Sequence, residues 1–91
     1  MPISMIKLIS VLCAGEKTLE LGFSDGTVGL WSAEPLIARD TVLTRSLCDP
    51  GYFRRAFIEA GALAWPNGLE LSAHNLHTQL DEAGALRRRA A

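Results

Sequence analysis

The chain has 91 residues, 48% of them hydrophobic, and a formal net charge of −1 at pH 7. A chain of this length fits one domain and buries only about 60 to 65% of its unfolded surface, so we expect a thin core and apolar surface left over for a partner. The balanced charge supplies no field that recruits nucleic acid, and no stretch reaches the roughly 18 apolar residues of a transmembrane helix.

The first segment, residues 6–13, is almost entirely apolar or small. Its β-branched residues favour a strand buried on both faces, at the centre of a sheet. The run is too short for a secretory or lipoprotein signal, and bulky Leu12 precedes Cys13 where a small residue would be expected. We therefore expect a cytoplasmic protein. Cys13 and Cys48 show no metal-binding spacing and are predicted to be small core residues.

Residues 18–23 alternate between polar and apolar, as in a half-buried strand. The dipeptide Asp25-Gly26 follows and is typical of a two-residue type I′ turn. Such a turn would place Phe23 opposite Val28, and it would put Trp31 on the other face of the hairpin.

Pro35 predicts a single helical turn within residues 32–39. Residues 40–48 show no period and are predicted to form an irregular connection. Asp49 and Pro50 are typical of a capped turn. Three apolar residues are expected to anchor the connection: Val42, Leu43 and Leu47.

The second half of the chain predicts short strands and one helix. Residues 54–59 and 62–65 are expected to be strands joined by a turn at Ala60-Gly61, with a third strand at 69–71. Ser72 can cap a helix whose inward stripe is Leu76 and Leu80, and Gly84 marks its end.

These elements predict an α+β domain over residues 1–84: a small antiparallel sheet of about five strands built from hairpins, one C-terminal helix, and one or two short helical turns. Residues 85–91 carry Arg87, Arg88 and Arg89. Nothing in the sequence ties this segment down, so it is predicted to be a basic, flexible tail.

Three short motifs occur in a fixed order: Phe23-Ser24-Asp25-Gly26-Thr27-Val28-Gly29, Asp49-Pro50-Gly51-Tyr52-Phe53 and Trp65-Pro66-Asn67-Gly68-Leu69-Glu70-Leu71. Together they resemble domain-of-unknown-function family 2442, small bacterial domains, over roughly residues 6–80. The resemblance implies a compact α+β domain with an antiparallel sheet and no established activity. Some relatives carry a further helix-turn-helix domain or are encoded beside toxin-like proteins, which implies a regulatory or antitoxin-like role. The chain departs from the family pattern at Ser72-Ala73, where relatives often have a proline in second place.

Residues that could carry chemistry are few. His74 and His77 share a helix face with Asp81, but a third convincing metal ligand is missing, so a solvated helix face is the better interpretation. Asp25 and Asp49 stand where turns require aspartate. No serine or cysteine lies in a nucleophile motif. We therefore predict no catalytic residues, no metal, no cofactor and no enzymatic activity.

The aromatic residues are candidates for a partner interface. In a domain with a thin core we favour the core for these residues, Trp65 first of all. Trp31, Tyr52 and Phe53 are the candidates for a partner interface, and among the aromatic residues Trp31 is the first candidate to face a partner. Arg87, Arg88 and Arg89 are the candidate contacts for a nucleic-acid backbone.

Two functions remain open from the sequence. The first is a protein-interaction or self-association module, a homodimer or a partner of another chain, that acts through an exposed sheet edge. The alternative is a regulatory or antitoxin-like component associated with nucleic acid. The low net charge makes nucleic acid the weaker expectation, and no membrane association is expected.

Overall fold

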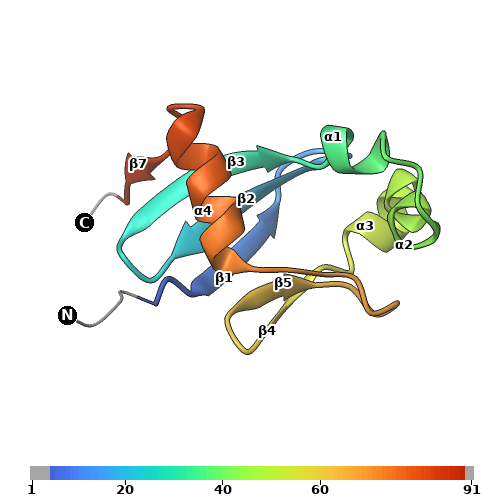
Figure 1. Ribbon diagram of the computed structural model, residues 1–91, viewed down its shortest axis with the longest axis horizontal. Coiled ribbons are helices and arrows are strands. Elements are labelled where there is room, and N and C mark those ends of the chain that lie inside the picture. Colours follow the sequence, from blue (N-terminus) through green and yellow to red (C-terminus); the bar gives the residue numbers. More distant parts are fainter. Residues whose placement is uncertain (1–4, 90–91) are drawn as a thin grey trace.

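The computed structural model describes residues 5–89 and shows an α+β fold with antiparallel sheets (Figure 1). The large sheet has the order β1-β2-β3-β7, with these bounds: β1 Leu8–Cys13, β2 Thr18–Phe23, β3 Thr27–Ser32 and β7 Arg87–Arg88. The small sheet has the order β4-β5-β6: Phe57–Glu59, Ala62–Ala64 and Glu70–Leu71. The helices are α1 Glu34–Ile37, α2 Val42–Arg45, the 3-10 turn η1 Ser46–Cys48, α3 Pro50–Phe53 and α4 Ala73–Glu82. The predicted fold class is confirmed, with two sheets in place of the single one expected.

Strand β1 lies at an edge of the large sheet, so the prediction of a central strand is wrong. Leu8 is buried, but Ile9 and Leu12 are 56% and 62% exposed. The apolar run favoured a strand with a neighbouring strand on each side. Among the described strands, β1 pairs with β2 alone. The strand ends at Cys13, whose side chain is exposed, as is that of Cys48, so neither cysteine is the core residue we predicted.

The β2–β3 hairpin is present, but its register differs by one residue from the prediction. Leu19 pairs with Trp31 and Gly22 with Val28, which leaves a three-residue loop, residues 24–26. In this loop the Gly26 N–H donates to the Phe23 carbonyl at 3.1 Å and Gly26 has φ +88°. The only non-glycine residues of positive φ in the described part of the chain are Asp40 and Ala60, which excludes a type I′ turn at Asp25. The loop is a type I turn followed by a left-handed glycine.

A one-residue shift turns every β3 side chain to the opposite face. Trp31 is therefore in the core, 6% exposed, and Leu30 points outward, 56% exposed. Leu19, Leu21 and Phe23 are buried on one face of β2, as predicted. We call this face of the large sheet, which α4 covers, the inner face, and the opposite one the outer face.

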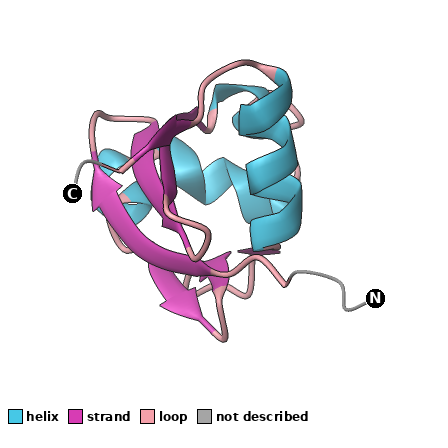
Figure 2. Ribbon diagram, turned by 90° about the vertical axis from the view of Figure 1, so that its left-hand side faces the viewer, coloured by secondary structure: helices cyan, strands magenta, loops and turns pink. Residues whose placement is uncertain are grey.

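Helix α4 packs along the inner face (Figure 2). Ser72 caps it by accepting a hydrogen bond from the Asn75 N–H, and Leu76 and Leu80 are buried. At its end Gly84 has φ +68°, and the Ala85 N–H donates to the Leu80 carbonyl at 2.8 Å. The predicted cap, stripe and end of this helix are all confirmed.

Residues 42–48 form α2 and η1, so the prediction of an irregular connection over residues 40–48 is wrong for all but its first two residues. Thr41 and Thr44 form a reciprocal capping box at the start of α2, and Thr44 is buried. Leu47 is fully buried as expected, whereas Val42 and Leu43 are exposed. A single helical turn is too short for a hydrophobic period to reveal it.

Local turn chemistry was predicted correctly in the small sheet. Ala60 and Gly61 have φ of +53° and +83°, and Glu59 pairs with Ala62 across them, which is a two-residue type I′ turn. Strand β4 begins only at Phe57, later than predicted. Asp49 caps α3 by accepting from the Gly51 N–H.

The predicted flexible tail is a strand where the structure describes it. Arg88 pairs with Thr27 and Arg87 with Val28, and the Arg89 N–H donates to the Gly26 carbonyl at 2.8 Å. The expectation that nothing ties this segment down is therefore wrong for residues 87–89. Residues 90–91 lie outside the described part of the chain.

The hairpin loop generates the first prediction. Gly26→Val should lower the free energy of unfolding by about 1 kcal/mol or more, because a β-branched residue is strained at positive φ. The measurement is the urea denaturation midpoint. Gly15→Val is the matched control, since Gly15 has no positive φ and only ordinary contacts around its missing Cβ. Equal losses in the two variants would contradict the assignment of the loop.

Candidate interaction surfaces

The edge of β1 carries unpaired backbone groups. The Leu8 N–H donates to the Gly61 carbonyl, so the small sheet covers the start of the strand. At the other end the Ala14 N–H donates to the Thr18 carbonyl of the neighbouring strand. Along an antiparallel strand the backbone N–H and C=O groups of successive residues point to alternate sides. Those of Val11 and Cys13 therefore point away from β2. Among residues 5–89, no backbone hydrogen bond outside the β1–β2 ladder involves residues 9–13.

The outer face of the large sheet presents apolar side chains next to this edge. The register aligns Leu12, Glu20 and Leu30 across three strands. Leu12 and Leu30 are 62% and 56% exposed. Between them, Glu20 accepts a hydrogen bond from Arg87 at 3.1 Å, which offsets its charge. Edge and face together form one surface whose apolar residues lie beside the Glu20–Arg87 pair and beside Arg89, which donates to Ser10 Oγ.

The three arginines predicted to contact nucleic acid all have partners within the chain. Arg87 pairs with Glu20, Arg88 donates to the Asp25 carbonyl at 2.9 Å, and Arg89 donates to Ser10 Oγ at 3.1 Å. Contact with a nucleic acid stays a prediction, and it would require exchanging these exposed hydrogen bonds for phosphate contacts.

The aromatic residues predicted to face a partner lie mostly in the core. Trp31 donates its indole N–H to Gln79 Oε1 at 3.4 Å, and Phe53 is fully buried. The predicted register, which put Trp31 on the face opposite Leu21, is therefore wrong, whereas contact of Trp31 with a partner stays a prediction. Tyr52 is half-buried, and its hydroxyl accepts from the Asn67 N–H. Trp65 is fully buried, as predicted.

His77 and Asp25 form a pair that the sequence did not reveal, because they lie 52 residues apart and each was explained by its own local structure. His77 Nε2 lies 2.9 Å from Asp25 Oδ2, and the imidazole meets the ring of Phe23 edge to face at 5.1 Å. An ionised carboxylate only accepts, so Nε2 carries the hydrogen. His74 is exposed and is not part of this pair. Within residues 5–89, no group of three His, Cys, Asp or Glu side chains could hold a metal ion.

The pKa of Asp25 is set by opposing effects. Partial burial raises this pKa. Hydrogen bonds from the Thr27 hydroxyl and N–H, together with the hydrogen bond and charge of His77, lower it by more than burial raises it, so the pKa of Asp25 falls below its ordinary value of 3.8. The hydrogen bonds are short, 2.6 Å from Thr27 Oγ1 and 3.1 Å from its backbone nitrogen. The ionised form of Asp25 is thus favoured by folding.

A second surface feature is a cleft of about 420 Å³ where the end of β3, α1, β6 and α4 meet. Its volume lies within the range of ligand sites. Apolar side chains, among them Trp31, Leu36 and Leu76, line it together with polar ones. The polar and charged lining residues are Ser32, Arg39, Glu70, Ser72, Asn75 and Gln79.

No protein-family model matches the chain, and comparison with curated proteins and with solved structures finds no similar protein. The resemblance to family 2442 therefore stays a prediction. No helix in the described residues is long and apolar enough to cross a membrane.

The Asp25 pair generates the second prediction. Because folding depresses the pKa of Asp25, its contribution to stability is present above pH 3.8 and is lost as the pH falls through the lower folded value. Asp25→Asn should therefore be less stable than the wild type at neutral pH, and the gap should narrow on acidification. Unfolding free energies from urea titrations between roughly pH 2 and pH 7, a range that covers the titration of carboxyl groups, would measure this difference in stability.

His74→Ala and His77→Ala serve as a matched pair on the same helix. His77→Ala should reduce the loss of stability caused by Asp25→Asn, and His74→Ala should not, because of these two histidines only His77 contacts the Asp25 carboxylate. A gap between wild type and Asp25→Asn that stays constant across the pH range would refute the depressed pKa.

Proposed function

We propose that this chain is a protein-interaction module that self-associates through β1 and acts without catalysis of its own. The observation that carries this proposal is the edge of the large sheet at β1, beside exposed Leu12 and Leu30. The residues of β1 are themselves uncharged, and in the described part of the chain residues 9–13 form no backbone hydrogen bond beyond β2.

Free sheet edges are templates for pairing with another strand, and many proteins protect them with lysine, proline or a covering segment. Strand β1 has the sequence Leu-Ile-Ser-Val-Leu-Cys, without a charge or a proline. One irregularity between Leu8 and Ser10 and the contact with Gly61 protect only its start. Strand β4 also contacts β1, but residues 9–13 form no backbone hydrogen bond with it, which supports a role in strand addition.

A second copy of the chain fits this edge by symmetry. Val11 is the midpoint of the open stretch, and its N–H and C=O point outward. A two-fold axis beside Val11 lets the two copies exchange both hydrogen bonds at that residue, as antiparallel strands do. Leu12 of one copy would then lie opposite Ser10 of the second, within reach of its Leu12.

The absence of charge also favours a second copy. A two-fold axis brings each residue close to its own equivalent, so a charged residue at the centre of β1 would meet a like charge. Strand β1 has none. The two large sheets would become one continuous sheet, with the exposed apolar side chains of both copies on a shared outer face.

The third prediction tests this interface. The wild type should sediment as a dimer at micromolar concentration, and Leu12→Lys should weaken dimerisation about tenfold or more, because the two ammonium groups would be diagonal neighbours on the same face across the axis. Sedimentation equilibrium gives the masses. Leu30→Lys is the matched control, since Leu30 is similarly exposed but lies two strands away from the edge. Both variants should keep the wild-type circular dichroism spectrum.

A wild-type monomer mass that persists into the hundreds of micromolar would refute self-association. Dissociation by Leu30→Lys but not by Leu12→Lys would show that the copies stack through their outer faces instead of pairing through their edges.

A further inference from the structure

The small sheet has a free edge of its own, and it lines the cleft. Strand β6 is the last strand of that sheet, and Glu70, Leu71 and Ser72 all contribute to the cleft wall. Figure 1 shows the segment that leads into α4 on the side of β5 that faces β3 and α1.

Glu70 offers unpaired backbone groups at this edge. The Trp65 N–H donates to the Leu69 carbonyl at 3.0 Å, and Leu71 pairs with Leu63, so the backbone groups of residues 69 and 71 point toward β5. Alternation then directs the N–H and C=O of Glu70 away from β5. Within the described residues, no backbone hydrogen bond outside the small sheet involves Glu70.

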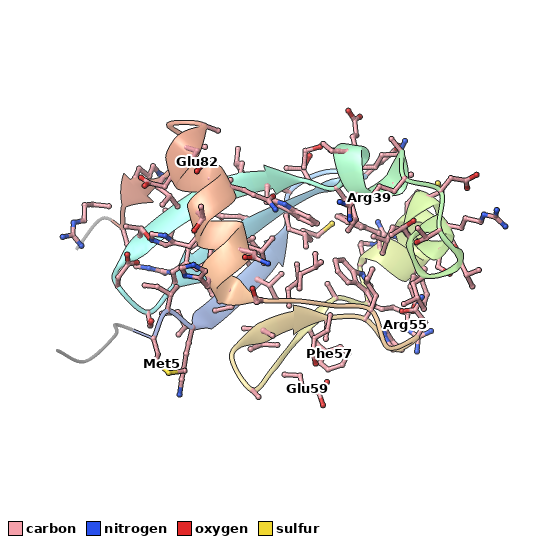
Figure 3. The ribbon with its side chains drawn as sticks, in the orientation of Figure 1. Met5, Arg39, Arg55, Phe57, Glu59 and Glu82 are labelled. Atoms are coloured by element: carbon pink, nitrogen blue, oxygen red, sulfur yellow. The ribbon has the colours of Figure 1, made fainter. Side chains whose placement is uncertain are left out.

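Two opposite charges lie at the cleft without neutralising each other: Arg39, and Glu70, whose side chain alternates to the face of β6 opposite Leu71. Arg39 and Glu70 both line it, yet neither forms an ion pair with the other or with any residue in the range 5–89. Figure 3 shows the Arg39 side chain extending from the end of α1 toward the middle of the molecule. A ligand with complementary charges would satisfy both groups.

We infer that the cleft binds an extended peptide segment of another protein, which adds a strand to β6. Free backbone groups at the edge supply main-chain hydrogen bonds, and a pocket for alternate side chains supplies specificity. A peptide residue opposite Leu71 shares the inward face of the sheet, so an apolar side chain there covers Trp31 and Leu76. An acidic residue reaches Arg39, and a basic residue opposite Glu70 completes the match.

A second copy of β6 is a poor occupant of this edge. Antiparallel pairing of two copies about Glu70 would bring like carboxylates together, which is destabilising. The opposite charges of Arg39 and Glu70 thus favour a peptide from a different protein. That peptide would carry an apolar residue with a basic and an acidic residue nearby. This inference rests on the cleft and is independent of dimerisation through β1.

The fourth prediction is tested by selecting a phage-displayed library of random decapeptides on the immobilised full chain. Peptides that combine an apolar residue with a nearby acidic one should be enriched. On Arg39→Glu the acidic preference should be lost and replaced by a basic one. Arg55→Glu is the matched control: Arg55 is also exposed and lies over the Tyr52 ring at 5.7 Å, and it does not line the cleft.

A peptide selected on the wild type should bind Arg39→Glu about fivefold more weakly or worse, and Arg55→Glu with unchanged affinity. In amide NMR spectra it should shift the signals of Glu70 and Ser72 and leave those of Val11 and Leu12 in place. Melting curves confirm that the variants fold, and Arg39→Gln replaces Arg39→Glu if they do not. Absence of enrichment over an uncoated surface, equal effects of the two arginine variants, or shifts confined to β1 would each overturn the inference.

Discussion

The three-residue loop between β2 and β3 fixes the register on which the rest of the structure depends. Because the left-handed turn is taken by Gly26, Trp31 and Gly29 face α4 and Leu30 faces outward. Gly29 is needed there: a Cβ atom would lie 2.9 Å from the Ala85 carbonyl oxygen and 3.1 Å from Leu80. The glycine thus permits the close approach of α4, and in the register that the sequence favoured this contact would have no explanation.

The tip of the same hairpin is where distant parts of the chain meet. Ser24 exchanges two hydrogen bonds with Lys7, one from its N–H to the Lys7 carbonyl and one from the Lys7 N–H to its hydroxyl. Asp25 binds His77 of α4, and its carbonyl accepts from Arg88 of β7. The motif around Asp25-Gly26 therefore has a structural role: it connects the hairpin to Lys7, to α4 and to β7. This role explains the motif without catalysis.

The motif around Trp65 and Asn67 forms a second joint. The Trp65 indole donates to the Phe53 carbonyl, and the Asn67 side chain donates to the Leu43 carbonyl while its backbone N–H donates to the Tyr52 hydroxyl. These bonds attach α2 and α3 to the small sheet. The motifs that suggested a family resemblance thus hold the architecture together, which is why they indicate a fold more clearly than an activity.

What could be predicted from the sequence was set by local chemistry. The cap at Ser72 and the turn at Ala60-Gly61 each involve residues close in sequence, and both are confirmed. The register of β3 could not be settled, because Asp-Gly suits both a type I′ turn and a type I turn with a bulge, and β3 has apolar residues on both faces. Strand β7 is two arginines long and carries no pattern.

The candidate sites depend on contacts between residues that are even further apart in the sequence. An exposed sheet edge was expected, but β1 was taken for a central strand, because a strand's neighbours are not encoded in its own residues. The cleft needs two segments, residues 31–39 and 70–79, to converge across about thirty intervening residues, which no local pattern predicts.

The two free edges differ in the chemistry that decides their partners. The residues of strand β1 are uncharged, so a symmetric pair of such strands brings no like charges of β1 itself together at its axis. Strand β6 carries Glu70 beside a cleft that also holds Arg39, so two copies would repel each other there, whereas an oppositely patterned peptide would be attracted. The two proposals together imply a dimer that binds two peptides, and avidity would then strengthen the binding of a multivalent partner without any additional contact.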